Sequence, residues 1–142
     1  MWSSEYTIET AASPAAVWSL WSDPACEHEY DEGIEWARLD GPLAPGTKGQ
    51  LKLRGAPQGG FTVLEVEPGR RIITQAGPPL ARMRFDRRVE PLAAGGSRLY
   101  EQITIRGPFA GVVGFLFGRS MAERLPKALH NLSRLAEQTP AR

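Results

Sequence analysis

Glu101 is the residue whose type and position most clearly suggest chemistry. It shares the phase of Leu99, Ile103 and Ile105 in a segment that alternates apolar and polar residues. A carboxylate among apolar side chains is costly unless it is paired, and burial raises its pKa. Such a group could act as a general acid or base, or could hold a hydroxyl or an amine of a ligand. The alternative is that the strand twists or bulges, so that Glu101 reaches water or pairs with an arginine.

Tyr100 and His28 are the further candidates for acid/base chemistry. His28 lies in the segment CEHEYDE, where Cys26 and Asp31 invite a metal-binding interpretation. The segment lacks the C-x-x-C and H-E-x-x-H spacings of known metal sites, and the other histidine, His130, is predicted on the polar side of a helix. We therefore expect no metal ion. The chain also lacks a nucleophile elbow, a phosphate loop and a dinucleotide fingerprint, so we expect no cofactor. His28 could instead line the rim of a cavity.

A long helix is predicted from about residue 111 to residue 137. At the helical period, Gly114, Gly118 and Met121 fall on one apolar face together with the leucines that follow. Pro126 lies inside this pattern, and because the apolar face keeps its phase on both sides, we expect a kink rather than an end. Glycine removes side-chain volume on the inward face. Either the helix approaches the sheet closely at these two positions, or space is left for a ligand.

Seven strands and two short helices are predicted before the long helix. The strands span residues 5–10, 33–41, 47–54, 61–67, 71–76, 80–92 and 98–107. Ser13 is a suitable N-cap for the first short helix, with Pro14 in its first turn, and a second short helix begins at Pro24. An antiparallel sheet and a single long helix must bury one face of each against the other, so the fold class is α+β. A twisted sheet around one helix is not filled everywhere by side chains, which makes a cavity between them plausible.

The composition indicates one globular domain over residues 1–142. The chain is 42% hydrophobic and 23% charged, and its net charge of +1 gives no global reason to expect nucleic acid or an anionic membrane. A single cysteine excludes an internal disulfide, and the N-terminal residues do not resemble a signal peptide, so we expect a cytoplasmic protein. The apolar run of residues 108–118 is about half as long as a membrane span requires.

The arginines near residue 85 predict a solvent-facing sheet surface. Arg82, Arg84 and Arg88 share one face of their predicted strand with Asp86, which is typical of local charge pairing. Nucleic-acid binding needs stacking aromatic residues on the basic face, and Phe85 alternates to the opposite face. We therefore expect no nucleic-acid partner.

A set of aromatic residues and methionines could face inward, either as ordinary core or as the wall of a ligand cavity. Its members are Tyr30, Trp36, Phe61, Met83, Phe85, Phe117 and Met121. Apolar residues at structural periods usually form core. The mixture of rigid aromatic rings with adaptable methionines also suits a cavity wall. Together with Glu101, Gly114 and Gly118, these residues form the predicted ligand-binding set.

Four motifs carry a resemblance to a known family: ASPAAVWSLWSDP, GPLAPGTKGQLKL, VLEVEPGRRI and IRGPFAGVVGFLFGRSMAERLPKALHNLSRLAE. With the order of elements, they resemble the SRPBCC superfamily of helix-grip folds, in its polyketide cyclase/dehydrase and lipid transport branch related to START domains. The resemblance implies a seven-stranded antiparallel sheet around a long kinked C-terminal helix, with two short helices closing an apolar cavity. Members bind lipids, sterols, polyketides or hormones, and a minority catalyse cyclisation, dehydration or hydrolysis. Tyr30 stands where relatives often carry a tryptophan.

Three hypotheses for function follow. The leading one is a carrier or sensor that binds a hydrophobic or amphipathic small molecule in the cavity. The alternative is a polyketide-type cyclase or dehydratase, with Glu101 or Tyr100 and the rim residue His28 supplying acid/base chemistry. The third is a structural or regulatory partner protein with a collapsed cavity, which bulky side chains beside Gly114 and Gly118 would support.

A homodimer contact is a separate expectation from the long helix. Val112, Val113 and Leu116 are predicted to point away from its inward face and could meet a second copy of the chain.

Overall fold

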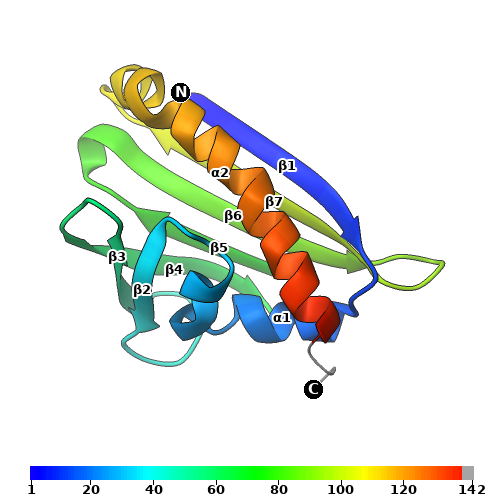
Figure 1. Ribbon diagram of the computed structural model, residues 1–142. Helices are drawn as coiled ribbons and strands as arrows, with labels where there is room; N and C mark the ends of the chain where they lie inside the picture. The colour runs from blue at the N-terminus through cyan, green and yellow to red at the C-terminus, as the bar shows by residue number, and fades with distance from the viewer. Residues whose placement is uncertain (139–142) are drawn as a thin grey trace.

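The computed structural model describes residues 1–138, which form a seven-stranded antiparallel sheet with a long helix lying across one face (Figure 1). The elements follow in the order β1 Trp2–Thr10, α1 Pro14–Trp21, the 3-10 helix η1 Pro24–Glu29, β2 Ile34–Leu39, β3 Lys48–Leu53, β4 Gln58–Glu67, β5 Arg71–Ala76, the 3-10 helix η2 Pro79–Ala81, β6 Arg82–Pro91, β7 Ser97–Arg106 and α2 Ala110–Gln138. The short η2 turn was not predicted from the sequence.

The strands are arranged in the order β1-β7-β6-β5-β4-β3-β2. Strands β2 to β7 form a meander, in which each strand pairs with its neighbour in sequence. Strand β1 pairs with β7 at the other edge, with Trp2 opposite Ile105 and Thr10 opposite Ser97. The predicted fold class is confirmed: this is an α+β helix-grip fold.

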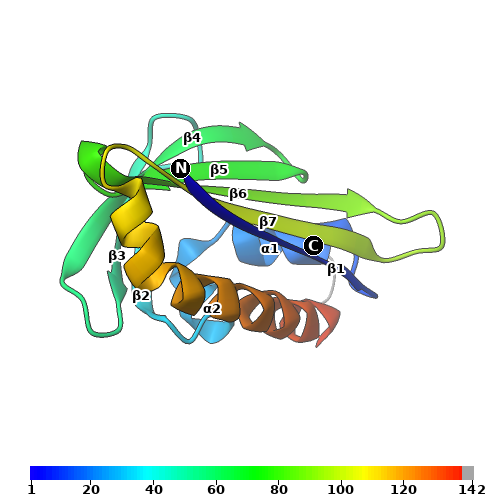
Figure 2. The same ribbon diagram turned by 90° about the horizontal axis from the view of Figure 1, so that it is seen from above.

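Helix α2 contacts β1, β7 and α1 and buries the face that its periodicity predicts. Figure 2 shows that α2 bends between its gold first turns and the orange-to-red remainder. Pro126 lies in the second half of the helix. Proline has no N–H to donate and its ring presses on the preceding turn, which accounts for a bend on its N-terminal side. No helix among residues 1–138 is both long enough and apolar enough to cross a membrane.

The two short helices, α1 and η1, lie at one end of the space between the sheet and α2 (Figure 1). Ser13 caps α1 as predicted, because its Oγ accepts a hydrogen bond of 3.1 Å from the N–H of Ala16. Asp23 caps η1 in the same way, accepting from the N–H of Ala25 at 3.1 Å. These caps fix where α1 and η1 begin, and so fix the end wall of the space behind them.

The core lies between the sheet, α1 and the second half of α2. Its most fully buried side chains are Val17, Val63, Ser97, Leu99, Ile105, Leu129 and Leu132. They come from α1, β4, β7 and α2, so the packing ties the short first helix to both larger layers. The first half of α2, by contrast, lies over a part of the sheet that is not filled.

Candidate functional site

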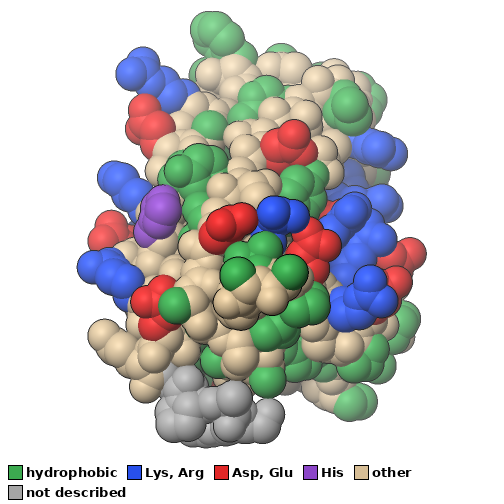
Figure 3. Space-filling model, turned by 90° about the vertical axis from the view of Figure 1, so that its right-hand side faces the viewer, with side chains coloured by type: hydrophobic (Ala, Val, Ile, Leu, Met, Phe, Trp, Pro, Cys, Tyr) green, Lys and Arg blue, Asp and Glu red, His purple; other side chains and the backbone are tan. Residues whose placement is uncertain are grey.

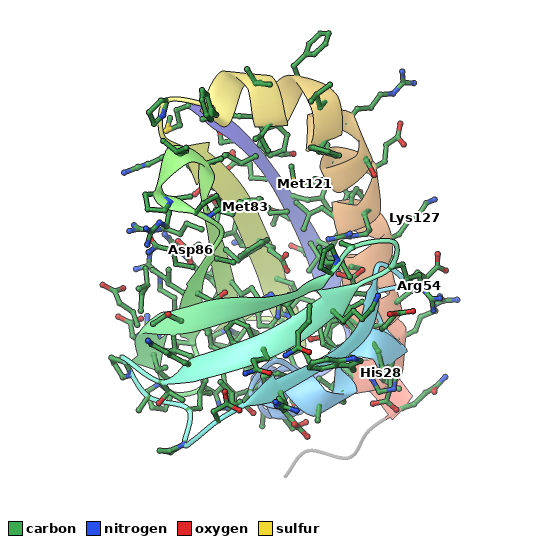
Figure 4. The ribbon with its side chains drawn as sticks, turned by 90° about the vertical axis from the view of Figure 1, so that its left-hand side faces the viewer. His28, Arg54, Met83, Asp86, Met121 and Lys127 are labelled. Carbon is green, nitrogen blue, oxygen red and sulfur yellow. The ribbon has the colours of Figure 1, made fainter. Side chains whose placement is uncertain are left out.

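A cavity of about 340 Å³ lies between the inner face of the sheet and α2. Its wall is mainly apolar, with Leu51, Phe61, Val63, Met83, Phe85 and Ile103 from the sheet and Val113, Phe117, Met121, Leu125 and Ala128 from α2. Figure 4 shows Met83 on β6 and Met121 on α2 on opposite walls of this space. The volume is within the range of small-molecule pockets, which is about 300–1,000 Å³.

Part of the predicted inward-facing set lines this cavity. These residues are Phe61, Met83, Phe85, Glu101, Phe117 and Met121. Their positions follow from the strand alternation and the helical period, which direct every second strand residue and every third or fourth helix residue inward. Val113 also lines the cavity and is half-buried, so the expectation that it points away from the inward face is corrected.

An ion-pair cluster lies at one end of the cavity wall. The Nε of Arg87 donates to Oε1 of Glu101 at 3.1 Å, and the Nη1 of Arg87 lies 2.7 Å from Oε1 of Glu27. A second pair joins Nε of Arg124 to Oδ1 of Asp31 at 3.3 Å. We call these five residues the polar pole. All five line the cavity, and they come from η1, the segment after it, β6, β7 and α2.

The polar pole has more negative than positive groups. Three carboxylates face two guanidinium groups, and each guanidinium is already paired with at least one carboxylate. Burial raises the pKa of Glu101 above its usual range, Arg87 opposes this rise, and the carboxylates of Glu27 and Asp31 add to it. Burial alone would lower the pKa of Arg87, but Glu101 and Glu27 raise it well above its usual value, so Arg87 stays charged.

Two buried polar groups outside the polar pole keep hydrogen-bonding capacity that the protein does not use. Among the described residues, two buried donors have no hydrogen-bond partner, Nε1 of Trp21 and Oη of Tyr30. Trp21 lines the cavity through other atoms of its side chain, since its N–H itself is buried. A buried polar group without a partner costs roughly 1–3 kcal/mol.

Gly114 and Gly118 do not leave room for a ligand, and that expectation is corrected. A methyl group at Gly114 would lie 2.7 Å from Cδ1 of Trp2, and one at Gly118 would lie 2.6 Å from Nε1 of the same indole. The two glycines therefore allow β1 to approach α2 closely. The Trp2 indole fills the space beside them, as the collapsed-cavity hypothesis requires. The cavity is nevertheless present beside other residues of α2, such as Phe117 and Met121.

Trp36 and Tyr30 do not line the cavity either. The register of β2 shifts between Ile34 and Trp36, so that Ile34 and Leu39 both face the cavity and Trp36 does not. The guanidinium of Arg38 lies 5.5 Å from the Trp36 ring centre. Tyr30 is buried in the core, where burial raises its pKa well above the usual value for tyrosine.

Tyr100 and His28, the other candidates for acid/base chemistry, lie away from the cavity wall. Tyr100 follows Leu99 on β7 and therefore faces the outer surface, where its hydroxyl donates to Oε2 of Glu5 at 2.6 Å. His28 is exposed on η1, at a distance from Met83 and Met121 (Figure 4). Of the three candidates, the cavity wall holds only Glu101.

Glu27, Asp31, Arg87 and Arg124 line the site and were missing from the predicted ligand-binding set, and for Arg87 the sequence did carry a signal. Arg87 has the phase of Met83, Phe85 and Val89 on β6, and that alternation was the available signal. The neighbouring arginines were grouped together as an outer surface, and for Arg88 that interpretation agrees with the structure. Arg88 lies on the outer face, where its Nη2 donates to Oδ2 of Asp86 at 2.9 Å.

Metal ligation finds no support among the described residues. Within residues 1–138, no group of three or more His, Cys, Asp or Glu side chains is arranged to hold a metal ion. The sulfur of Cys26 lies within hydrogen-bonding distance of the carbonyl oxygen of Asp23, at 3.0 Å, and burial raises the pKa of its thiol to about 11.

Comparison with known families gives the relationship of the chain. The sequence matches the family described as polyketide cyclase / dehydrase and lipid transport over residues 1–137. The protein belongs to this family. A comparison with curated protein sequences finds no match.

Solved structures place this polyketide cyclase/dehydrase and lipid transport protein among helix-grip folds. A protein from Nitrosomonas europaea is similar with a TM-score of 0.76 and 18% identity, over 96% of this chain and 94% of that one. A hypothetical protein from Helicobacter pylori gives a TM-score of 0.77 and 16% identity, over 94% and 86%. The protein named Ara h 8.0201 gives 0.75 and 11%, over 97% and 99%. At these identities the likeness shows the fold alone.

Proposed function

We propose that this protein binds a hydrophobic or amphipathic small molecule in the cavity between the sheet and α2. The observation that carries the proposal is the cavity of about 340 Å³, whose largely apolar wall includes one polar end. Apolar walls with a few polar groups that fix orientation are typical of small-molecule sites. The family description, which includes lipid transport, agrees with this chemistry.

The polar pole disfavours an anionic head group on that molecule. An anionic head would find no uncommitted cation, because Arg87 is paired with Glu27 and Glu101, and Arg124 with Asp31. A hydroxyl group carries no charge and can donate a hydrogen bond to a carboxylate of the pole, such as that of Glu101 on the cavity wall. We therefore expect alcohols or phenols with an apolar body to bind better than the corresponding carboxylates.

The test uses the uncharged fluorescent probe N-phenyl-1-naphthylamine, which brightens in apolar surroundings. Decan-1-ol and decanoate share a chain and differ in their heads, so their ability to displace the probe isolates the effect of the pole. We expect decan-1-ol to compete at concentrations at least about tenfold lower than decanoate. Equal competition would refute the selectivity of the pole, and a failure of the probe itself to bind would refute the cavity function.

Matched variants link the signal to the cavity. Ala128 on α2 lines the cavity, so Ala128→Phe should fill it and abolish probe binding. Ala122 lies on the same helix outside the cavity wall, and Ala122→Phe should leave probe binding unchanged. If both variants bind the probe equally, the probe is bound elsewhere.

A cyclase or dehydratase remains the second candidate function, and Glu101 is the residue that supports it. Burial raises the pKa of the Glu101 carboxyl, and a carboxyl with a raised pKa is suited to act as a general acid or base. A carrier should tolerate Glu101→Gln with altered affinity alone. An enzyme should still bind its ligand and lose turnover, which a product assay on the co-purified ligand would detect.

A further inference from the structure

The exposed large hydrophobic side chains of residues 1–138 all belong to one end of the molecule. They are Met1, Leu80, Phe109, Val112, Phe115, Leu116 and Phe117, which we call the apolar tip. The backbone brings them together, because the N–H of Phe109 donates to the carbonyl of Leu80 at 2.9 Å and Trp2 pairs with Ile105. Phe115 is 87% exposed, more than any core or cavity role explains. The uppermost side chains in Figure 3 are hydrophobic, with Lys or Arg side chains on the flanks.

Basic side chains outnumber acidic ones around the apolar tip, although Arg119 pairs at 3.1 Å with Glu123, which lies one helical turn further along α2. Residues 1–4, 76–84 and 104–122 contain four arginines and no aspartate or glutamate. These are Arg82, Arg84, Arg106 and Arg119, and Arg82 lies opposite Arg106 in the sheet. The whole chain has 17 basic and 16 acidic residues, so its net charge conceals this local basic region.

We propose that the apolar tip docks onto an anionic lipid surface. Aromatic and aliphatic side chains would enter the boundary between head groups and acyl chains, and the arginines would meet the lipid phosphates. The basic charge of the tip favours an anionic bilayer over a second copy of the chain as the occupant. A symmetric dimer through the tip would bring the arginines of both copies against each other, whereas an anionic bilayer is complementary to them. A bilayer also needs no shape complementarity from the strongly projecting Phe115.

The apolar tip adjoins the cavity. Phe117 belongs to the tip and also lines the cavity, and Val113, one turn earlier in α2, lines it too. A hydrophobic molecule could therefore pass between the bilayer and the cavity past these two side chains. This last step rests on the proposed function, whereas the docking itself does not.

The experiment is co-sedimentation of the protein with sucrose-loaded vesicles. Phosphatidylcholine vesicles are compared with vesicles containing roughly 30% phosphatidylglycerol, in about 0.1 M salt. We expect at least about tenfold tighter binding to the anionic vesicles. The double variant Phe115→Ser with Leu116→Ser should lose this binding, and Arg119→Glu should weaken it several-fold. Arg134→Glu reverses an exposed charge at the other end of α2 and should bind as the wild type does.

Two outcomes would overturn the docking proposal. One is that neither kind of vesicle binds the wild-type protein. The other is that the protein is a dimer by light scattering and the double variant is a monomer, which would make the tip an interface between copies. Probe binding in the cavity, measured on the same samples, separates the two proposals, because the double variant alters no residue of the cavity wall.

Discussion

Alanine at Gly114 should destabilise the protein, although alanine is the better helix former. The new Cβ would lie 2.7 Å from Cδ1 of Trp2. This is about 1 Å closer than an ordinary carbon–carbon contact. Overpacking of this kind costs about 1–3 kcal/mol, while the gain in helix propensity is about 1 kcal/mol. We therefore expect a net loss of up to about 2 kcal/mol for Gly114→Ala, and a similar loss for Gly118→Ala.

Gly111 on the same helix is the matched control. A Cβ there would meet nothing within 4 Å, so Gly111→Ala should keep the propensity gain of up to about 1 kcal/mol. Equilibrium unfolding in urea, followed by circular dichroism, gives all three free energies. In a Trp2→Ala background the steric conflict disappears, so Gly114→Ala should become neutral or stabilising. If Gly114→Ala stabilises the wild-type protein as Gly111→Ala does, the indole does not fill this space and the glycines do leave a void.

Three further predictions concern the polar pole and a helix cap, all measured by urea unfolding. Arg87→Met should lower the free energy of unfolding by about 3–5 kcal/mol, because Glu27 and Glu101 stay buried without their cation. The control Arg84→Met, on the exposed face of the same strand, should change it by less than about 0.5 kcal/mol. Glu101→Gln should become more stable relative to wild type as pH rises from about 4 to about 8. The pKa of Glu101 is raised in the folded protein, so the unfolded chain loses this proton first and rising pH destabilises the wild type, whereas glutamine does not titrate. Ser13→Ala should lose about 1 kcal/mol with the N-cap of α1.

Each of these predictions has a result that contradicts it. A loss below about 1 kcal/mol for Arg87→Met would mean that water reaches both carboxylates. Wild-type protein that gains stability over Glu101→Gln with rising pH would mean that the attraction of Arg87 exceeds the cost of burial. An unchanged Ser13→Ala variant would mean that another group satisfies the first turn of α1.

The architecture could be predicted because local patterns specify it. Alternation in the strands, the Ser13-Pro14 start of α1 and the helical period around Pro126 are each contained within a few residues. The inner position of Glu101 followed from the same alternation on β7. A period-two pattern assigns a side chain to a face without any knowledge of the partner strand.

The parts of the site that escaped prediction depend on partners distant in sequence or on breaks in the pattern. Trp2 meets Gly114 across more than a hundred residues, so the sequence could not decide between close approach and open space. The shift in register after Ile34 turned Trp36 away from the cavity, and nothing local indicates it. Arg87 is a different case. It alternates along β6 with Phe85 and Val89, which predicts an inward position, but the many charged residues around it favoured assigning the arginines of this strand to the outer face.

The pairing of β1 with β7 has a consequence for the synthesis of the chain. Trp2 and Ser3 lie opposite Ile105 and Thr104, and the Trp2 indole rests on a helix that begins at Ala110. Strand β1 is therefore synthesised well before β7 and α2, and it can neither pair nor be covered until both have been made. Contacts this far apart in sequence slow folding and leave an edge exposed in the meantime. The alternation of polar residues along β1 is what would keep this waiting strand from pairing with another chain.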